Sequence, residues 1–498
     1  MAITPEIKKA VIKNQIKVTA KNAVECKINL SEEELGNVIL STGRAFLNVS
    51  ECHQNEILYG GKITFNVITD LGGLKKTEAG VEFSYKTEVN GVNEGDTVVI
   101  DVALDNIKVS MQNGLPVITA AILVNGFVDK ISEFEYVKGI SQANCKNGEV
   151  KNLCLVQSEN KNFTLEDEFD LDYSISEVLF HDEKVKVSSV KSGIGSVNIE
   201  GEVELLALVL GVEDKKPKIE KRVIPFNIEK DMQKAMPDLI AVTCPVVKDA
   251  NLKVVVDKAK EKSAVACQIE LCFHTEIFEN EVIMYTLDGY STKNRLSFEK
   301  CAQKTRCIDG QKPFENKISL TSELKNQKNA GLVCPLFAKI EQSEVVYNNQ
   351  TPCLSGALNV SSLALGDSGY YIENTLIPFN FNLDSNCNEI SVSCLQAFNL
   401  LVTENAESVN YSVTLTGLIS ETSSLDALFI VKVVEGEEIV CNDSAISVYV
   451  PNKNDTLWDL SKALGVLEEE ILKTNPELSF PLSGEERVIV YREIGKLS

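Results

Sequence analysis

The sequence predicts a multi-domain, mainly β protein, in which three related β-sandwich-like repeats precede a small βααβ domain. Two patterns predict this fold: a strand motif that recurs three times along the chain, and two short amphipathic helices framed by short strands near the C-terminal end. The chain has 498 residues, of which 44% are hydrophobic and 24% charged. This is the composition of folded globular proteins and the length of several domains.

The first residues predict a short helix. Thr4-Pro5 places a proline at the first helical position, which suits proline because the amide that it lacks has no partner there. We therefore expect an N-terminal helix or extension over residues 1–21, with β structure beginning at residue 22.

The recurring motif begins with a glycine and alternates apolar with other residues, as a strand does. It reads GKITF at 61–65, GEVEL at 201–205 and GALNV at 356–360. A phenylalanine follows each copy at a similar interval, and these are Phe83, Phe226 and Phe379. The last two lie in identical Ile-Pro-Phe-Asn segments, followed by Ile-Ala-Val-Thr-Cys at 240–244 and Ile-Ser-Val-Ser-Cys at 390–394. Ordered recurrence at similar spacing predicts three diverged β domains, over 22–135, 160–290 and 316–436.

Each predicted copy is long enough to bury a core of its own, so we expect separate domains arranged like beads on a chain. The polar segments 141–161 and 301–317 are the expected boundaries. A third junction, 421–443, is less polar and contains Ala427–Val434, an apolar segment that we interpret as a strand passed between domains.

The C-terminal residues 446–492 predict a complete miniature domain. Thr456 suits the N-cap of a first helix, and Gly465 suits the left-handed residue that ends it. Leu457, Leu460 and Leu464 give that helix one apolar face. A second helix is expected near Leu467, and the framing strands are expected at 448–450 and 488–491.

Several of these residues together resemble a LysM domain: Asp-Thr-Leu-Trp at 455–458, Gly465, Asn475-Pro476 and the closing strand. The sequence departs from that pattern at Asn454, where LysM domains usually have glycine, and at Val490-Tyr491, where they usually have Ile-Pro. LysM domains hold N-acetylglucosamine polymers between two loops, here 452–457 and 475–482. The resemblance implies a contact patch made of Asp455, Thr456, Leu457, Trp458, Asn475 and Pro476.

Three diverged β domains followed by a LysM domain resemble the SipL-like spore coat morphogenetic proteins, whose repeats are SPOCS domains. The resemblance rests on the glycine-led strand, the Ile-Pro-Phe-Asn segment and the C-terminal domain, and the first copy departs most, with Glu82-Phe83-Ser84. It implies a protein of the mother cell that helps to place the coat at the forespore surface. There the LysM domain would bind SpoIVA, the ATPase of the coat basement layer, and the β repeats would recruit other coat proteins.

Charge and cysteine usage favour a protein of the cytoplasm. Forty-nine basic against 72 acidic residues give a net charge of −23, which repels phosphate backbones, so we expect no nucleic-acid partner. The N-terminal residues lack the apolar core of a secretory signal, and no segment has the ~20 apolar residues of a membrane span. The 14 cysteines are scattered singly, as free thiols are, although a disulfide framework is the alternative.

The sequence contains few candidates for catalysis. Its most suggestive cluster is Cys267, Cys272 and His274, but on a strand Cys267 faces away from the other two. We therefore expect that the protein has no metal site and no cofactor, and that it is not an enzyme. Trp458, the only tryptophan, is either the core anchor of the small domain or a contact in its groove.

Three classes of function follow: a coat adaptor, a peptidoglycan-binding wall protein, and an enzyme with accessory β domains. The absence of an export signal and the acidic charge favour the adaptor.

Overall fold

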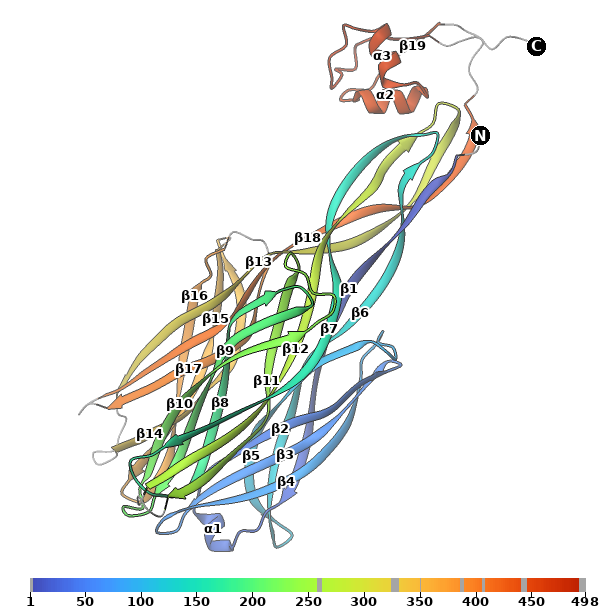
Figure 1. The fold of residues 1–498 in the computed structure, drawn as a ribbon. Coiled ribbons are helices and arrows are strands. Elements are labelled where there is room, and N and C mark those ends of the chain that lie inside the picture. Colours follow the sequence, from blue (N-terminus) through green and yellow to red (C-terminus); the bar gives the residue numbers. More distant parts are fainter. Residues whose placement is uncertain are drawn as a thin grey trace.

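The computed structural model describes residues 3–257, 262–323, 331–349, 351–385, 389–404, 408–439 and 446–491, most of them in antiparallel strands (Figure 1). The prediction of a mainly β protein is therefore confirmed. Figure 1 shows sheets side by side at one end of the molecule and a slender stalk at the other, with the C-terminal elements beyond the tip of the stalk.

The first unit has six strands and one short helix. They are β1 (Pro5–Lys27), α1 (Glu32–Gly36), β2 (Val38–His53), β3 (Glu56–Asp70), β4 (Leu74–Glu88), β5 (Thr97–Gln112) and β6 (Leu115–Ile140). They form two three-stranded sheets, of order β1-β6-β5 and β2-β3-β4. The first strand thus pairs with the last, and β2, β3 and β4 form the whole second sheet.

The predicted N-terminal helix is wrong, because β1 is a strand that pairs with β6 along its whole length. Pro5 begins this strand, a position where proline sacrifices no interior hydrogen bond. Ala10 and Ile12 alternate with more exposed residues and are buried, which is the period of a strand. Pairing with a strand more than a hundred residues away overrides the local preference of residues 5–21 for a helix.

The same strand order occurs twice more. The second unit consists of β7 (Asn144–Asp170), β8 (Ile175–Ser192), β9 (Ser196–Gly211), β10 (Pro217–Asp231), β11 (Ile240–Asp257) and β12 (Lys262–Tyr290). The third consists of β13 (Asn294–Glu323), β14 (Gly331–Asn348), β15 (Thr351–Gly366), β16 (Gly369–Asn382), β17 (Glu389–Glu404) and β18 (Ser408–Glu438). Their sheets are β11-β12-β7 with β10-β9-β8, and β13-β18-β17 with β14-β15-β16. The recurrence in the sequence coincides with a recurrence of topology.

The glycine and phenylalanine of the recurring motif face each other on neighbouring strands. Gly201 lies opposite Phe226, and Gly356 lies opposite Phe379. A Cβ added at Gly201 would stand 2.5 Å from the Phe226 ring, and one at Gly356 would stand 2.5 Å from the Phe379 ring. The ring thus covers the space over a strand residue that has no side chain, which explains why the two residues recur together.

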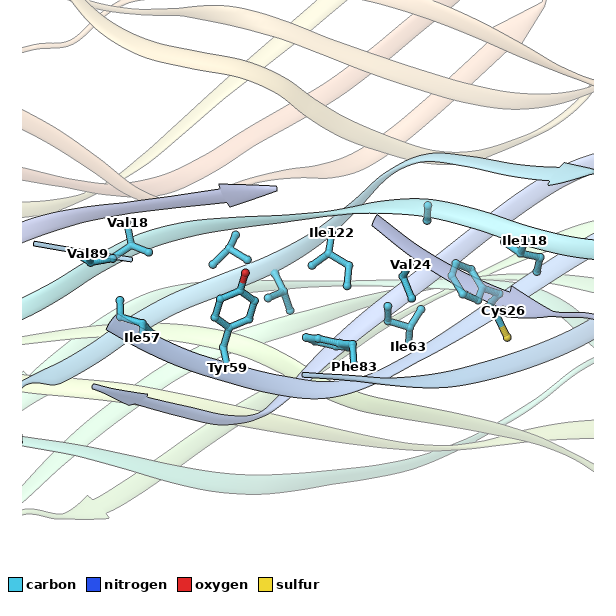
Figure 2. Close-up of a cluster of buried hydrophobic side chains, with 14 of the residues drawn as sticks. Val18, Val24, Cys26, Ile57, Tyr59, Ile63, Phe83, Val89, Ile118 and Ile122 are labelled. Atoms are coloured by element: carbon cyan, nitrogen blue, oxygen red, sulfur yellow. The ribbon is translucent and has the colours of Figure 1, made fainter. Parts of the chain in front are cut away.

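Each unit encloses a core between its two sheets. In the first unit Tyr59, Ile63 and Phe65 of β3 are fully buried and meet Ile118 and Ile122 of β6, as Figure 2 shows for four of them. Corresponding clusters fill the second and third units.

The stalk is made of three two-stranded ribbons, one from each unit: β1–β6, β7–β12 and β13–β18. Phe429 of β18 is fully buried at their centre, with its ring centroid 4.9 Å from that of Phe134 of β6 and 4.5 Å from that of Tyr285 of β12. Residues from all three units therefore share one core here.

The expected boundary segments lie in strands that run from the stalk into the body. Most of 141–161 belongs to β7, and all of 301–317 belongs to β13. Ala427–Val434 is a strand, as predicted, but it lies inside β18 and pairs with β13 of the same unit. Ribbon strands expose one face to water, so their polar composition resembles that of a linker.

A second shared core joins the other ends of the units. It combines Ile68 of β3 with Leu179 and Leu208 of the second unit and with Leu336 and Leu363 of the third. The expectation of beads on a chain is therefore wrong. Sequence patterning indicates that a unit can bury its own core, but it does not reveal which outer faces are also apolar.

Charged side chains cross the junction between the first and second units. The Lys13 ammonium lies 2.8 Å from the Asp129 carboxylate and 2.6 Å from that of Glu276. Arg44 of β2 donates to the carboxylate of Glu183 of β8, whose side chain is fully buried. In both clusters each buried carboxylate contacts a basic side chain, as burial requires, although Asp129 and Glu276 share Lys13.

Beyond the third unit the chain forms β19 (Ile446–Tyr449), α2 (Leu457–Leu464), α3 (Glu468–Thr474) and β20 (Val488–Tyr491). The two strands pair antiparallel. We call residues 446–491 the C-terminal module.

Candidate functional site

The C-terminal module has a small core of its own, which includes Leu460, Leu464, Ile471, Val488 and Val490. Local sequence sets its helix ends. The Thr456 hydroxyl accepts from the Asp459 amide at 3.3 Å, and the Asp459 carboxylate accepts from the Thr456 amide at 2.9 Å, so the two residues form a capping box. Gly465 ends α2 with a φ of 64°, the left-handed conformation that glycine adopts without strain.

The two loops predicted to form a ligand groove are tied to each other. The Asn454 amide donates to the Leu482 carbonyl at 2.8 Å, and the Leu482 amide donates to the Asp455 carbonyl at 3.0 Å. The Asp455 side chain accepts from the Asn452 amide at 2.8 Å and so closes its own loop. Asn454 has a φ of 72°, which asparagine tolerates better than most residues. Asparagine in place of the usual glycine is therefore compatible with the conformation of this loop.

Asn475 is fully buried and joins α3 to β20. Its amide nitrogen donates to the Ile471 and Ile489 carbonyls at 2.9 and 2.8 Å, and its amide oxygen accepts from the Ile489 amide at 2.7 Å. These bonds satisfy most of the hydrogen-bonding capacity of an asparagine side chain, so this residue stabilises the module. Pro476, beside it, is exposed.

Trp458 points to the stalk. Its indole nitrogen donates to the Asp288 carboxylate at 3.0 Å, and its ring lies edge-on to Tyr290, with 5.1 Å between the centroids. Asp288 and Tyr290 belong to β12 at the tip of the stalk. The sequence offered two roles for this tryptophan, as core anchor or as groove contact, and the structure gives it a third, in the contact between the module and the second unit.

Lys462, one helical turn beyond Trp458, strengthens this contact. Its ammonium group lies 2.6 Å from the Asp288 carboxylate. Burial alone would raise the pKa of Asp288, but the hydrogen bonds from Lys462 and Trp458 outweigh it and hold that pKa below its usual value. We call the contact of Trp458 and Lys462 with Asp288 and Tyr290 the stalk contact.

The six residues predicted to form one contact patch are thus distributed among different roles. Three of them, Thr456, Asp455 and Asn475, stabilise loops and helix ends. Leu457 packs against the module core, Trp458 lies in the stalk contact, and Pro476 is exposed. Their prediction as a partner-binding patch stays a prediction.

The outer face of the β19–β20 sheet is open and apolar, and the sequence analysis missed it. Ile446 pairs with Tyr491, and Val448 pairs with Ile489. These four side chains and Val450 are between 36% and 61% exposed. The signal was present in the strand 448–450, where apolar residues occupy both faces, as expected of a strand with a contact on each side. We call this surface the open sheet face.

The other residues considered for chemistry lie in strands. Cys267 is buried in the core of the second unit, and the His274 ring nitrogen Nδ1 lies 2.8 Å from the Asn160 side-chain oxygen. Cys301 and Cys307, expected in a polar linker, lie in β13. Within the parts of the chain that the structure describes, no three His, Cys, Asp or Glu side chains gather as metal ligands do. Over the same residues, no helix has the length and apolar character that crossing a bilayer requires.

One protein family matches part of the chain. The family described as SipL, SPOCS domain, matches residues 34–112, which run from α1 through β5 of the first unit. No curated protein and no solved structure gives a significant match. The match points to a sporulation-related protein of SipL-like type.

Proposed function

We propose that this protein is a non-enzymatic adaptor in endospore coat assembly. It acts in the cytoplasm of the mother cell at the forespore surface, and its C-terminal module is a LysM domain that docks to a SpoIVA-like coat ATPase. The observation that carries the proposal is the match of the SipL, SPOCS domain family to the first unit, whose topology recurs twice more before the module.

The arrangement of the molecule supports an adaptor. The three units share two cores and form one long body, and the module is held at the tip of its stalk through α2. Among the residues that the structure describes, the stalk contact leaves the open sheet face exposed, so a partner can bind the module while the body recruits other coat proteins.

The alternative, a peptidoglycan-binding protein, needs the groove between loops 452–457 and 475–482. Asp455 and Asn475 of those loops are engaged in hydrogen bonds within the module, which supports the adaptor. Eight acidic against five basic residues from Ser447 to Arg492 also disfavour anionic wall polymers.

The test is a pull-down with the tagged full-length chain, using the purified SpoIVA-like ATPase of the same organism, beside sedimentation with purified peptidoglycan. We expect capture of the ATPase, and loss of capture in the double variant Val448→Asp, Ile489→Asp. Val246→Asp, an exposed valine of β11, is the matched control and should bind as the original chain does. Sedimentation with peptidoglycan and no capture of the ATPase would overturn the proposal.

A further inference from the structure

Two cysteines from different units meet where the second and third units join. The Cys394 thiol of β17 lies 2.8 Å from the Cys244 sulfur of β11, although the two residues are 150 positions apart in the chain. They close the matching segments at 240–244 and 390–394, so they occupy corresponding positions of two repeats. The corresponding strand of the first unit, β5, has Asp101 at its fifth position, where β11 has Cys244.

The backbone of β17 is distorted at this cysteine. β17 has two register shifts, after Ser393 and after Phe398, whereas β5 and β11 each have one. The single shifts of β5 and β11 begin at Asp105 and Val247, about four residues beyond Asp101 and Cys244, and the second shift of β17 begins at Phe398, at the same interval beyond Cys394. The bulge at Ser393 is therefore an addition in the third unit. A bulge re-aims a side chain, and here it carries Cys394 to Cys244.

Cys394 also has a φ of 52°, a left-handed conformation that costs free energy for a residue with a Cβ. Strain of this kind persists where the surrounding structure imposes it, and it is concentrated at functional positions.

The two thiols are also chemically suited to react. Both are partly exposed, whereas Cys267 and Cys334 are buried, and burial raises the pKa of Cys334 to about 12. The hydrogen bond from Cys394 lowers the pKa of Cys244, even though burial and the Asp101 carboxylate act against it. The same hydrogen bond and burial raise the pKa of Cys394. The contact therefore favours the thiolate, the reactive form of cysteine, at Cys244 and the thiol at Cys394.

We propose that Cys244 and Cys394 are a modification site, an oxidisable pair that locks the second unit to the third by a disulfide. The co-reactant is a hydroperoxide. The Cys244 thiolate attacks its terminal oxygen and the O–O bond breaks. The departing alkoxide takes up the proton that Cys244 released on ionising, and it leaves as an alcohol, or as water when the oxidant is hydrogen peroxide. Cys394 then attacks the Cys244 sulfur, an S–S bond replaces the S–O bond, and the departing hydroxide takes the Cys394 proton to become water. Two thiols are oxidised, and one hydroperoxide is reduced to alcohol and water.

The crosslink would join two units that otherwise meet through non-covalent contacts. Since it closes a loop of about 150 residues, the chain-entropy account predicts a substantial restriction of the unfolded chain. Oxidised protein should therefore melt at a higher temperature than reduced protein.

The test treats the reduced full-length protein with one equivalent of hydrogen peroxide and maps its peptides without reduction. We expect the loss of two of the 14 thiols and a dominant peptide in which Cys244 is linked to Cys394. The melting temperature should rise, and a thiol reductant should reverse the change.

Cys244→Ser and Cys394→Ser should abolish the linked peptide and the rise in melting temperature. Cys301→Ser, at a partly exposed cysteine of β13, is the matched control and should behave as the original chain does. The peptide map of the original chain decides the matter without relying on the folding of any variant. Oxidation spread evenly over the cysteines, or a different dominant pair, would overturn the proposal.

Discussion

The body and the C-terminal module are attached by contacts of different kinds. The three units share two apolar cores, and buried ion pairs such as Arg44–Glu183 cross between them. The module contacts the stalk through one buried ring, Tyr290, and through an ion pair that is partly exposed, with Lys462 41% and Asp288 23% accessible. The comparison indicates that the units fold as one structure and that the position of the module depends on a few separable contacts.

The largest effect is expected when a buried ion pair of the body is broken. Arg44→Met leaves the fully buried Glu183 carboxylate without its main partner, which should cost about 3–5 kcal/mol of unfolding free energy. Denaturant unfolding followed by circular dichroism measures the loss.

Lys9→Met is the matched control for that variant. Lys9 faces Glu133 across 3.5 Å, but both side chains are more than 60% exposed, so the variant should stay within about 0.5 kcal/mol of the original. The double variant Arg44→Met, Glu183→Leu should recover part of the loss, because no charge is left buried. If the double variant is as unstable as the single one, the ion pair is not the cause.

Acid should weaken the same junction. Although burial alone would raise the pKa of Glu183, Arg44 and His181 hold it at about 2, below the ordinary value of 4.5. A depressed folded-state pKa gives stability that is present above pH 4.5 and is lost as the pH falls towards 2, on the order of 3 kcal/mol for this group.

Unfolding free energies measured from pH 6 to pH 2 test this expectation. Glu183→Gln cannot titrate, so the variant should be less stable at pH 6 and should lose less stability on acidification. Parallel curves for the two proteins would show that Glu183 does not supply the acid sensitivity.

The elements that sequence predicted best are those that local pattern determines. Thr456 begins α2 and Gly465 ends it, as expected. The glycine and phenylalanine that recur in the sequence proved to be a cross-strand pair within each unit. The errors at β1, at the polar segments and in the role of Trp458 share one cause. In each case the observed structure depends on a partner far away in the chain, such as Ile140 for Pro5 or Asp288 for Trp458. Neither periodicity nor composition identifies such partners.

The candidate site shows the same division. The capping residues were identified because their partners lie three positions away, as Asp459 does from Thr456. The open sheet face was missed, because the pairing of Ile446 with Tyr491 brings together residues from opposite ends of the module. The contact of Cys244 with Cys394 also follows only from the packing of two units, although the matching segments that hold these cysteines were visible in the sequence.

A smaller effect on stability is expected when the stalk contact is broken. Asp288→Ala removes the acceptor of both Trp458 and Lys462, and the module should then move relative to the body. Because Trp458 is the only tryptophan, its fluorescence emission should shift to longer wavelength as it becomes exposed to water.

The unfolding free energy of the body should change by no more than about 1 kcal/mol in that variant, since no charge is left deeply buried. Asp426→Ala removes an exposed carboxylate of β18 in the same stalk and should leave the emission unchanged. An Asp288→Ala protein with unchanged emission, or with a body that unfolds much earlier, would contradict the separability of the two regions.

The smallest effect is expected within the module itself, at the position where it departs from the LysM pattern. Asn454→Gly should be nearly neutral, because both residues accept the φ of 72° found there. Asn454→Val should cost about 1–2 kcal/mol of local stability, because a β-branched residue is strained in this conformation.

Amide hydrogen exchange at Ile489, which donates to Asn475, reports the opening of the module without unfolding of the body. Faster exchange at Ile489 in the valine variant, with unchanged exchange in β3 of the first unit, would place the effect in the module alone. Equal exchange in both variants would mean that the loop tolerates a branched side chain by adopting another conformation.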